Sequence, residues 1–167
     1  MRSASRWAFP AALLACVGCD QASKHVASLL LPGSSPVALL GGAVRLELVA
    51  NPGAFLSLGA GVPELARRVV LVGLVPFLLA LVCGIASRSA RRSRCALVAL
   101  GLIAGGGLGN WLDRLLHEGA VRDFVSVGLG PLRTGIFNLA DVAILGGLAL
   151  LLLSGRSAPR GSAGEPS

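Results

Sequence analysis

Four stretches of the chain are almost free of charged residues and predict membrane-spanning helices. They are Trp7–Leu31, Val69–Ala86, Cys95–Leu112 and Phe137–Ser154. The second and third carry no charged side chain over the roughly 18 residues that a helix needs to cross a bilayer. The fourth has Asn138 and Asp141 near its start, and the first is charge-free only as far as Cys19. The hydrophobic pattern therefore predicts four spans.

The amino-acid composition excludes a soluble globule and a disordered chain. Of the 167 residues, 54% are hydrophobic and only 14% are charged, and the mean hydropathy is +0.77. In soluble domains about a quarter of all residues are usually charged. We expect residues 1–154 to form one polytopic membrane domain, and residues 155–167 to form a polar, disordered cytoplasmic tail.

The connection between the first two spans, Pro32–Ala66, contains a strand pattern. Apolar residues alternate with charged ones along Ala43–Val49, and Gly41-Gly42 and Asn51-Pro52-Gly53 supply turns on either side. The later connection, Asp113–Gly135, is charged and punctuated by glycine, and we expect a loop there. The predicted fold class is thus all-α transmembrane, a four-helix membrane bundle with a small extracytoplasmic β-sheet.

The distribution of basic residues predicts the orientation in the membrane. With four spans and both termini inside, the inner side holds eight arginines and one acid, and the other basic and acidic residues balance on the outer side. The whole net charge of +7 then falls on one face, as the positive-inside rule requires. The charge therefore reports topology, and nucleic acid is not expected as a partner.

The N-terminal segment leaves two alternatives open. Cys16 and Cys19 form a CxxC pair without a second pair or a nearby metal motif, so we expect buried thiols rather than a zinc or redox site. Arg2, Arg6 and the apolar run after them also resemble a signal peptide, and Leu13-Leu14-Ala15-Cys16 resembles the box before a lipid-modified cysteine. Because three further spans follow, we favour an uncleaved first span.

Glycines in the third span predict close helix packing. Gly101, Gly105 and Gly109 recur at four-residue spacing, a pattern that lets a neighbouring helix approach closely.

Polar residues gather at the outer end of the predicted spans. Ionisable side chains at membrane depth are costly and mark function. The members of this group are Asp20, Lys24, Asn110, Asp113, Arg114, Asp123, Asn138 and Asp141. Several of these residues could have a purely structural role. Asp20 and Lys24 could form an i,i+4 ion pair, and Asp113 and Arg114 could form a charge pair at the helix end. Asn138 and Asp141 have the spacing of a capping box. Those roles do not explain four carboxylates at one interface.

Motifs that are absent from the sequence exclude several kinds of catalytic chemistry. The chain has neither a zinc-protease HExxH motif nor a GxSxG elbow. Lys24, the only lysine, leaves open a serine–lysine hydrolase with Ser57 as nucleophile. Paired aspartates are the better candidate, because two close carboxylates share one proton: the ionised member can activate water while the protonated member polarises an amide carbonyl.

Five motifs resemble those of lipoprotein signal peptidase (signal peptidase II), in their order and approximate spacing. They are Asp20-Gln21-Ala22-Ser23-Lys24, Asn51-Pro52-Gly53-Ala54, Gly105-Gly106-Gly107-Leu108-Gly109-Asn110-Trp111-Leu112-Asp113-Arg114, Val121-Arg122-Asp123-Phe124 and Phe137-Asn138-Leu139-Ala140-Asp141. The resemblance covers roughly residues 7–154. It implies an aspartic endopeptidase of the bacterial inner membrane that cuts prolipoproteins just before the diacylglyceryl-modified cysteine, is inhibited by globomycin-type compounds, and adds an outer β-cradle to its helices.

The resemblance also implies the roles of individual residues. Asp123 and Asp141 are the expected catalytic pair. The expected supporting residues are Asp20, Lys24, Asn51, Gly53, Asn110, Asp113, Arg114, Asn138 and Ala140. No metal or other cofactor is expected, and the expected state is a monomer in contact with membrane lipid. The glycines of the third span and the outer sheet are expected to wall the site for the lipid-modified cysteine.

Several positions depart from the family pattern. Ser23 replaces the usual threonine, Ala54-Phe55-Leu56-Ser57 replaces Ala-Ala-Phe-Ser, and Arg122 stands where a small or apolar residue is commoner. Asp113 is the rival for the catalytic pair. We favour Asp123, because Asp113 sits beside Arg114 and is expected to be held in a salt bridge. Asp141, at a helix N-terminus that favours anions, is the expected ionised partner, with the proton on Asp123.

Two other functions compete with the peptidase. One is a small transporter or assembly subunit with the aspartates as a proton relay, although relay residues are expected at mid-span. The other is a lipid phosphotransferase, whose dense aspartate motif is absent from the sequence.

Overall fold

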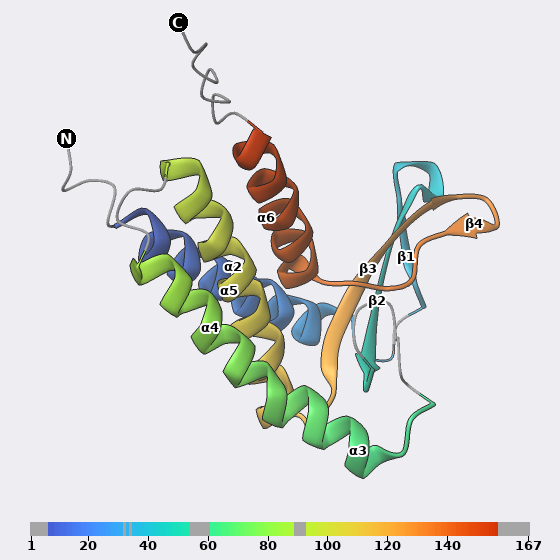
Figure 1. Cartoon of the computed structure of the whole chain (residues 1–167). Helices are drawn as coiled ribbons and strands as arrows, with labels where there is room; N and C mark the ends of the chain where they lie inside the picture. Colours follow the sequence, from blue (N-terminus) through green and yellow to red (C-terminus); the bar gives the residue numbers. More distant parts are fainter. Residues whose placement is uncertain (1–6, 32, 34, 54–60, 89–92, 157–167) are drawn as a thin grey trace, which may run out of the picture.

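The chain forms a helical body with a small antiparallel sheet at one end (Figure 1). The structure, a computed structural model, describes residues 7–31, 33, 35–53, 61–88 and 93–156. The helices are α2 (Ala8–Leu30), α3 (Glu64–Arg68), α4 (Val75–Arg88), α5 (Arg94–Leu116) and α6 (Leu139–Arg156); a π-helical segment, η3 (Val69–Leu74), joins α3 to α4, and a 3-10 turn, η1 (Leu40–Gly42), follows the first strand. The strands are β1 (Val37–Leu39), β2 (Val44–Asn51), β3 (Val121–Leu129) and β4 (Leu132–Arg133).

Helix α5 is the centre of the helical body. It packs against α2, α6 and α4, whereas α2 and α6 contact each other less. The start of α2, the end of α4, the start of α5 and the end of α6 lie at the end of the body far from the sheet (Figure 1). The helices therefore alternate in direction, as an up-and-down bundle requires.

The predicted spans correspond to these helices within a few residues at most ends. Two of them are long and apolar enough to cross a membrane, Glu64–Ala86 and Arg94–Leu116, and Leu139–Ser154 is a shorter apolar helix. The second span begins at Glu64, earlier than the predicted Val69, because the α3, η3 and α4 segments run on without a break. Helix α2 is continuous through both cysteines. Cys16 is buried as expected, whereas Cys19 is exposed, so the expectation of buried thiols is wrong for Cys19.

The sheet is larger than the sequence predicts, and an all-α class is too narrow for this fold. Its order is β1-β2-β3-β4, with all neighbours antiparallel. The predicted strand at Ala43–Val49 is confirmed as β2. The expected loop at Asp113–Gly135 is wrong: it contains strand β3, which pairs with β2 from Val44 opposite Val127 to Asn51 opposite Val121, with an irregularity between Leu46 and Val49.

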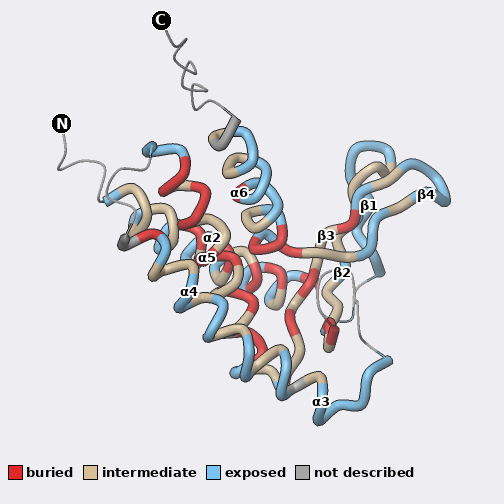
Figure 2. Tube along the Cα trace, viewed as in Figure 1, coloured by how far each residue is buried: buried red, intermediate tan, exposed pale blue. Residues whose placement is uncertain are grey.

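Buried residues lie where the helices pack against one another and where they meet the sheet (Figure 2), and the largest of the fully buried side chains are polar. The largest fully buried side chains are Lys24, Asn138, Asp20, Asp113 and Asp123. Large apolar side chains lie exposed along the outer faces of the helices, among them Leu14, Phe77, Leu81, Leu145 and Leu152. An apolar exterior around a polar interior is the arrangement that a lipid surrounding favours.

The glycines of α5 lie where neighbouring helices approach most closely. A methyl group added at Gly101, Gly105 or Gly109 would come within 2.5 to 2.8 Å of atoms of α2, including the Asp20 carboxylate. The prediction of close helix packing is therefore confirmed. The expectation that these three glycines wall a lipid site is wrong, because α2 covers them.

Replacing Gly106 by alanine is expected to loosen α5 from α6. The added methyl would lie 2.5 Å from the backbone oxygen of Ala140, and rigid main chain has little freedom to withdraw. We expect a loss of about 1–3 kcal/mol in the free energy of unfolding, measured by thermal unfolding in detergent. Gly146→Ala is the matched control on α6, because a methyl group added there would have nothing within 4 Å of it. Equal stability of the two variants would contradict this packing.

Candidate active site

The polar residues predicted from the sequence meet where the helices join the sheet. Asp20 and Lys24 come from α2, and Asn110, Asp113 and Arg114 from the last turns of α5. Asn51 ends β2, Asp123 lies in β3, and Asn138 and Asp141 open α6. All of these side chains are buried, each at most 8% exposed. Five elements thus contribute to one polar cluster in an otherwise apolar protein.

Asp123 is held by two amide groups. Its Oδ2 accepts a hydrogen bond from Asn51 Nδ2 (2.8 Å), and its Oδ1 accepts one from Asn138 Nδ2 (2.6 Å). The side chain of Asn51 is fixed in turn, because its Oδ1 accepts from the backbone N–H of Gly53 (2.9 Å). The Asn51-Pro52-Gly53 turn therefore orients the carboxylate of the neighbouring strand.

Asp141 and Asn138 form the capping box predicted from their spacing. The backbone N–H of Asn138 donates to Asp141 Oδ2 (3.2 Å), and the backbone N–H of Asp141 donates to Asn138 Oδ1 (3.1 Å). Both residues also make hydrogen bonds outside the capping box. Asn138 Nδ2 also reaches Asp123, and Asp141 Oδ1 accepts from Asn110 Nδ2 (2.9 Å).

Asn110 links the two parts of the cluster. Its Nδ2 donates to Asp141, while its Oδ1 accepts from Asn138 Nδ2 (3.0 Å) and from Lys24 Nζ (2.9 Å). Asp123 and Asp141 are thus connected through Asn138 and Asn110, and these donors to the two carboxylates are neutral. No Lys, Arg or His nitrogen of the described chain lies within ion-pair distance of either carboxylate.

Asp20 and Lys24 form the expected i,i+4 pair, but it is not exposed. Lys24 Nζ lies 2.8 Å from Asp20 Oδ2 and 3.4 Å from Asp113 Oδ2, and all three side chains are fully buried. The second oxygen of Asp20 accepts a hydrogen bond from the backbone N–H of Ala140 (3.0 Å). Asp20 therefore ties the start of α6 to α2 at Ala140, which is fully buried.

The expected pairing of Asp113 with Arg114 is wrong. Asp113 instead binds Arg122, with Nη2 2.8 Å from Oδ1, and Lys24. Adjacent helical residues point in different directions and do not face each other. Asp113 is nevertheless ion-paired, here with Arg122 and Lys24. An ion-paired Asp113 was the reason for choosing Asp123 over Asp113 as the catalytic residue. The sequence did not predict that Arg122 binds Asp113. It also did not predict the role of Gln21, whose Nε2 donates to Asp20, Asp113 and the carbonyl of Gly109.

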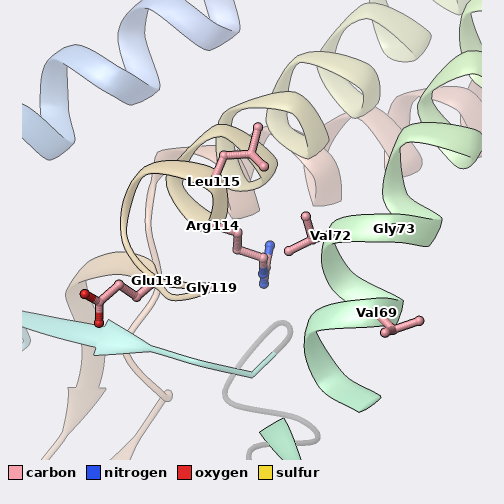
Figure 3. Close-up of a pocket in the computed structure, with 7 residues that line it drawn as sticks. All are labelled: Val69, Val72, Gly73, Arg114, Leu115, Glu118 and Gly119. Carbon is pink, nitrogen blue, oxygen red and sulfur yellow. The ribbon is translucent and has the colours of Figure 1, made fainter. Parts of the chain in front are cut away.

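Arg114 borders a pocket beside the cluster (Figure 3). Its guanidinium donates to the carbonyl oxygens of Gly53 (2.8 Å) and Asn110 (3.2 Å), and its buried Nε has no partner among the described residues. The pocket measures about 450 Å³ and lies between the end of α5 and the start of the second span; it is lined by Val69, Val72, Gly73, Arg114, Leu115, Glu118 and Gly119. Trp111 fixes this wall by donating to the carbonyl of Val72 (2.9 Å).

Burial sets the protonation of Asp123. Loss of solvent raises the pKa of its carboxyl to about 6, against the opposing effect of the hydrogen bonds from Asn51 and Asn138, and the charge of Asp141 adds to the rise. Among the described residues, no group of three or more His, Cys, Asp and Glu side chains is placed to hold a metal ion. Phe55 and Ser57 lie outside the described residues.

The fold and the site define a class of protein: a helical membrane protein with two buried acids at the place where its helices meet a sheet. Neither acid has an ion-pair partner among the described residues. A structure determined as a bacterial membrane enzyme has the same fold, with a TM-score of 0.75 over 93% of this chain and 92% of that one, at 22% identity. Residues 12–155 match the sequence model of the family described as signal peptidase (SPase) II. The chain belongs to the signal peptidase II family.

Curated relatives support the assignment to this family. The chain is 39% identical over 139 residues to a lipoprotein signal peptidase of Leifsonia xyli subsp. xyli, an alignment that covers 80% of this chain and 60% of the relative. It is 36% identical over 130 residues to a lipoprotein signal peptidase of Treponema denticola, covering 75% of each. The chain thus spans less than two thirds of the Leifsonia protein and three quarters of the Treponema protein.

Proposed function

We propose that this protein is an aspartic endopeptidase that removes the signal peptide of prolipoproteins immediately before the diacylglyceryl-modified cysteine. One observation carries the proposal. Asp123 and Asp141, eighteen positions apart, are buried together on the amide groups of Asn138, with no ion pair to either among the described residues. Family membership supplies the substrate class, because the curated relatives are named lipoprotein signal peptidases.

The arrangement of donors supports different roles for the two acids. Asp141 accepts a main-chain N–H at a helix N-terminus, which favours a carboxylate. Asp123 lies in a strand, and although two amide donors oppose the effect, burial raises its pKa to about 6, which makes the protonated form easier to reach than in an ordinary aspartate. In the proposed reaction Asp141 takes a proton from the attacking water, and Asp123 polarises the scissile carbonyl. Asp123 later protonates the leaving amine.

A membrane setting fits this chemistry. The apolar signal helix and acyl chains of the substrate remain in lipid, while the scissile bond must reach two acids and a water molecule. The pocket beside Arg114 opens among apolar side chains, and the guanidinium touches the turn that orients Asp123 through Asn51. We assign this pocket to the lipid-modified part of the substrate. Globomycin-type inhibitors are expected to compete there.

The proposed location is the bacterial cytoplasmic membrane, with four spans, both termini in the cytoplasm and the sheet on the outer side. The common end of the helices in Figure 1, far from the sheet, supports this orientation, and so does the excess of arginine that the sequence places there. A single domain over residues 1–154 and a monomeric state complete the proposal. Helix α6 reaches Arg156, two residues beyond that boundary.

The competing functions fit the geometry less well. A proton relay needs titratable groups through the membrane, whereas the four buried carboxylates of the described residues lie at the junction of helices and sheet. A serine–lysine hydrolase needs a lysine free to act as a base, whereas Lys24 is bound to Asp20, Asp113 and Asn110.

Cleavage of a defined substrate tests the proposed function. Purified protein is incubated with a prolipoprotein carrying the diacylglyceryl group, and with the same precursor whose cysteine is unmodified. We expect a product that begins at the lipid-modified cysteine, identified by mass spectrometry, and no product from the unmodified precursor. Failure to cleave the lipid-modified precursor, or equal cleavage of both, would contradict the proposal.

The shared proton predicts a bell-shaped pH dependence of kcat/KM. Because the raised pKa of Asp123 is about 6 in the free protein, the proton needed on this residue is present below that pH and is lost as the pH rises through it. Protonation of the ionised partner gives the second limb at lower pH. Initial rates between pH 4 and 9 on the lipid-modified precursor measure both limbs. A profile with one limb would contradict a shared-proton pair.

A further inference from the structure

Strand β3 turns two neighbouring residues in opposite directions. Side chains alternate across a strand, so Asp123 faces Asn51 and Asn138 while Arg122 faces α2 and α5. A shift of the strand that moves Arg122 must also move Asp123, because the two residues share one peptide unit. Whatever fixes Arg122 therefore fixes the proposed catalytic acid.

Arg122 is fixed by an unusually complete set of contacts. Its Nη2 lies 2.8 Å from Asp113 Oδ1, its Nε lies 3.4 Å from Asp113 Oδ2, and its backbone N–H donates to the same Oδ2 (2.9 Å). Its guanidinium also donates to Gln21 Oε1 (3.3 Å) and Ser28 Oγ (3.4 Å) on α2. One side chain thus joins β3 to the end of α5 and to α2.

The charges around Arg122 balance without using the proposed catalytic pair. Lys24 pairs with Asp20 and Asp113, and Arg122 pairs with Asp113. Two acids and two bases form a neutral quartet (Asp20, Lys24, Asp113 and Arg122), in which the Arg122 side chain is only 18% exposed. Without the Arg122 guanidinium, Lys24, which Asp113 shares with Asp20, would be the one cation left in the quartet to pair with the buried Asp113.

We propose that Arg122 is a positioning residue, which acts through Asp113 to hold β3 against α5 and α2 and so sets the place of Asp123 relative to Asp141. This inference rests on the proposed function. Here the main chain and the guanidinium of Arg122 bind the same carboxylate, so the strand is fixed at one register.

Kinetics of Arg122→Gln test this role. Since small displacements of a reacting group can lower the rate on the order of 100-fold, we expect kcat on the lipid-modified precursor to fall by about that factor. KM should stay within about twofold, because substrate binding is not the function removed. Arg122→Lys should lose roughly tenfold, because an ammonium keeps the charge but cannot bind both oxygens in a fork. Arg45→Gln, on the exposed face of β2, is the matched control and should be fully active.

A double-mutant cycle with Asp113→Asn separates action through Asp113 from an independent effect. If Arg122 acts through Asp113, the double variant should be no slower than the slower single variant. Multiplying losses, or a kcat of Arg122→Gln within about twofold of the unmodified protein, would overturn the inference. If Arg122→Gln does not fold, the Arg122→Lys variant decides by the same criterion, and unchanged kcat there would overturn it.

Thermal unfolding of the same four proteins in detergent distinguishes this inference from the proposed function. If Arg122 and Asp113 interact, their substitutions should change the unfolding temperature non-additively, and this can be measured without any enzymatic activity. Additive changes in unfolding temperature would overturn the positioning role. An unmodified protein that unfolds with this coupling but cleaves nothing would overturn the proposed function alone. An active unmodified protein with an equally active Arg122→Gln variant would overturn the positioning role alone.

Discussion

Asp123→Asn and Asp141→Asn are each expected to abolish cleavage of the lipid-modified precursor. An amide at either position can neither give up nor accept the proton that the reaction moves, and acid–base catalysis of this kind contributes up to about 10⁴-fold. Both side chains are buried, at 1% and 6% exposure, and asparagine keeps their shape. Product formation under single-turnover conditions, with enzyme in excess, measures the loss.

The matched control for these variants is Glu47→Gln. Glu47 is an exposed acid of β2, outside the polar cluster, so the same chemical change there should leave turnover unchanged. The unfolding temperature should stay close to that of the unmodified protein in all three variants. Residual turnover above about 1% in either aspartate variant would contradict a two-acid mechanism.

Lys24→Met is expected to give the largest loss of stability. Lys24 is fully buried and is the ion-pair partner of Asp20 (2.8 Å) and a partner of Asp113 (3.4 Å). Removing one partner from a buried ion pair costs about 3–5 kcal/mol, because the remaining charge is left uncompensated. Thermal unfolding in detergent measures the change.

Restoring the charge balance tests the cause of that loss. The double variant Lys24→Met with Asp20→Asn should be more stable than Lys24→Met alone, because it removes one of the stranded charges. Arg45→Met, an exposed cation of β2, should change the free energy of unfolding by no more than about 0.5 kcal/mol. Unfolding of Lys24→Met at the unmodified temperature would show that the quartet does not stabilise the fold.

The helices and one strand could be predicted because their signals are local. A charge-free run defines a span by its length, and the alternation along Ala43–Val49 defines β2 by its period. Strand β3 escaped prediction because its buried face carries Asp123 as well as Val121, while Arg122 and Phe124 occupy the other face. Because an acid takes a buried position of β3, the sequence there lacks the regular alternation of apolar and polar residues that identifies a strand.

The site could be predicted as a set of residues but not as a network. The capping box followed from three-residue spacing and is confirmed. The partner of Asp113 did not follow, because Arg122 reaches it only through the return of β3 onto α5, a tertiary contact without a local signal. The same holds for Asn110 of α5, whose two hydrogen-bonding groups join Lys24 of α2 to Asn138 and Asp141 at the start of α6.

The most direct test of the account compares Asp123→Asn with Asp113→Asn in single-turnover cleavage of the lipid-modified precursor. The two aspartates lie ten positions apart, both are buried, and both substitutions replace a carboxyl group by an amide of the same shape. We expect no product from Asp123→Asn and slow but measurable product from Asp113→Asn, because Asp113 holds Arg122 and Lys24. Product from Asp123→Asn together with none from Asp113→Asn would contradict this expectation.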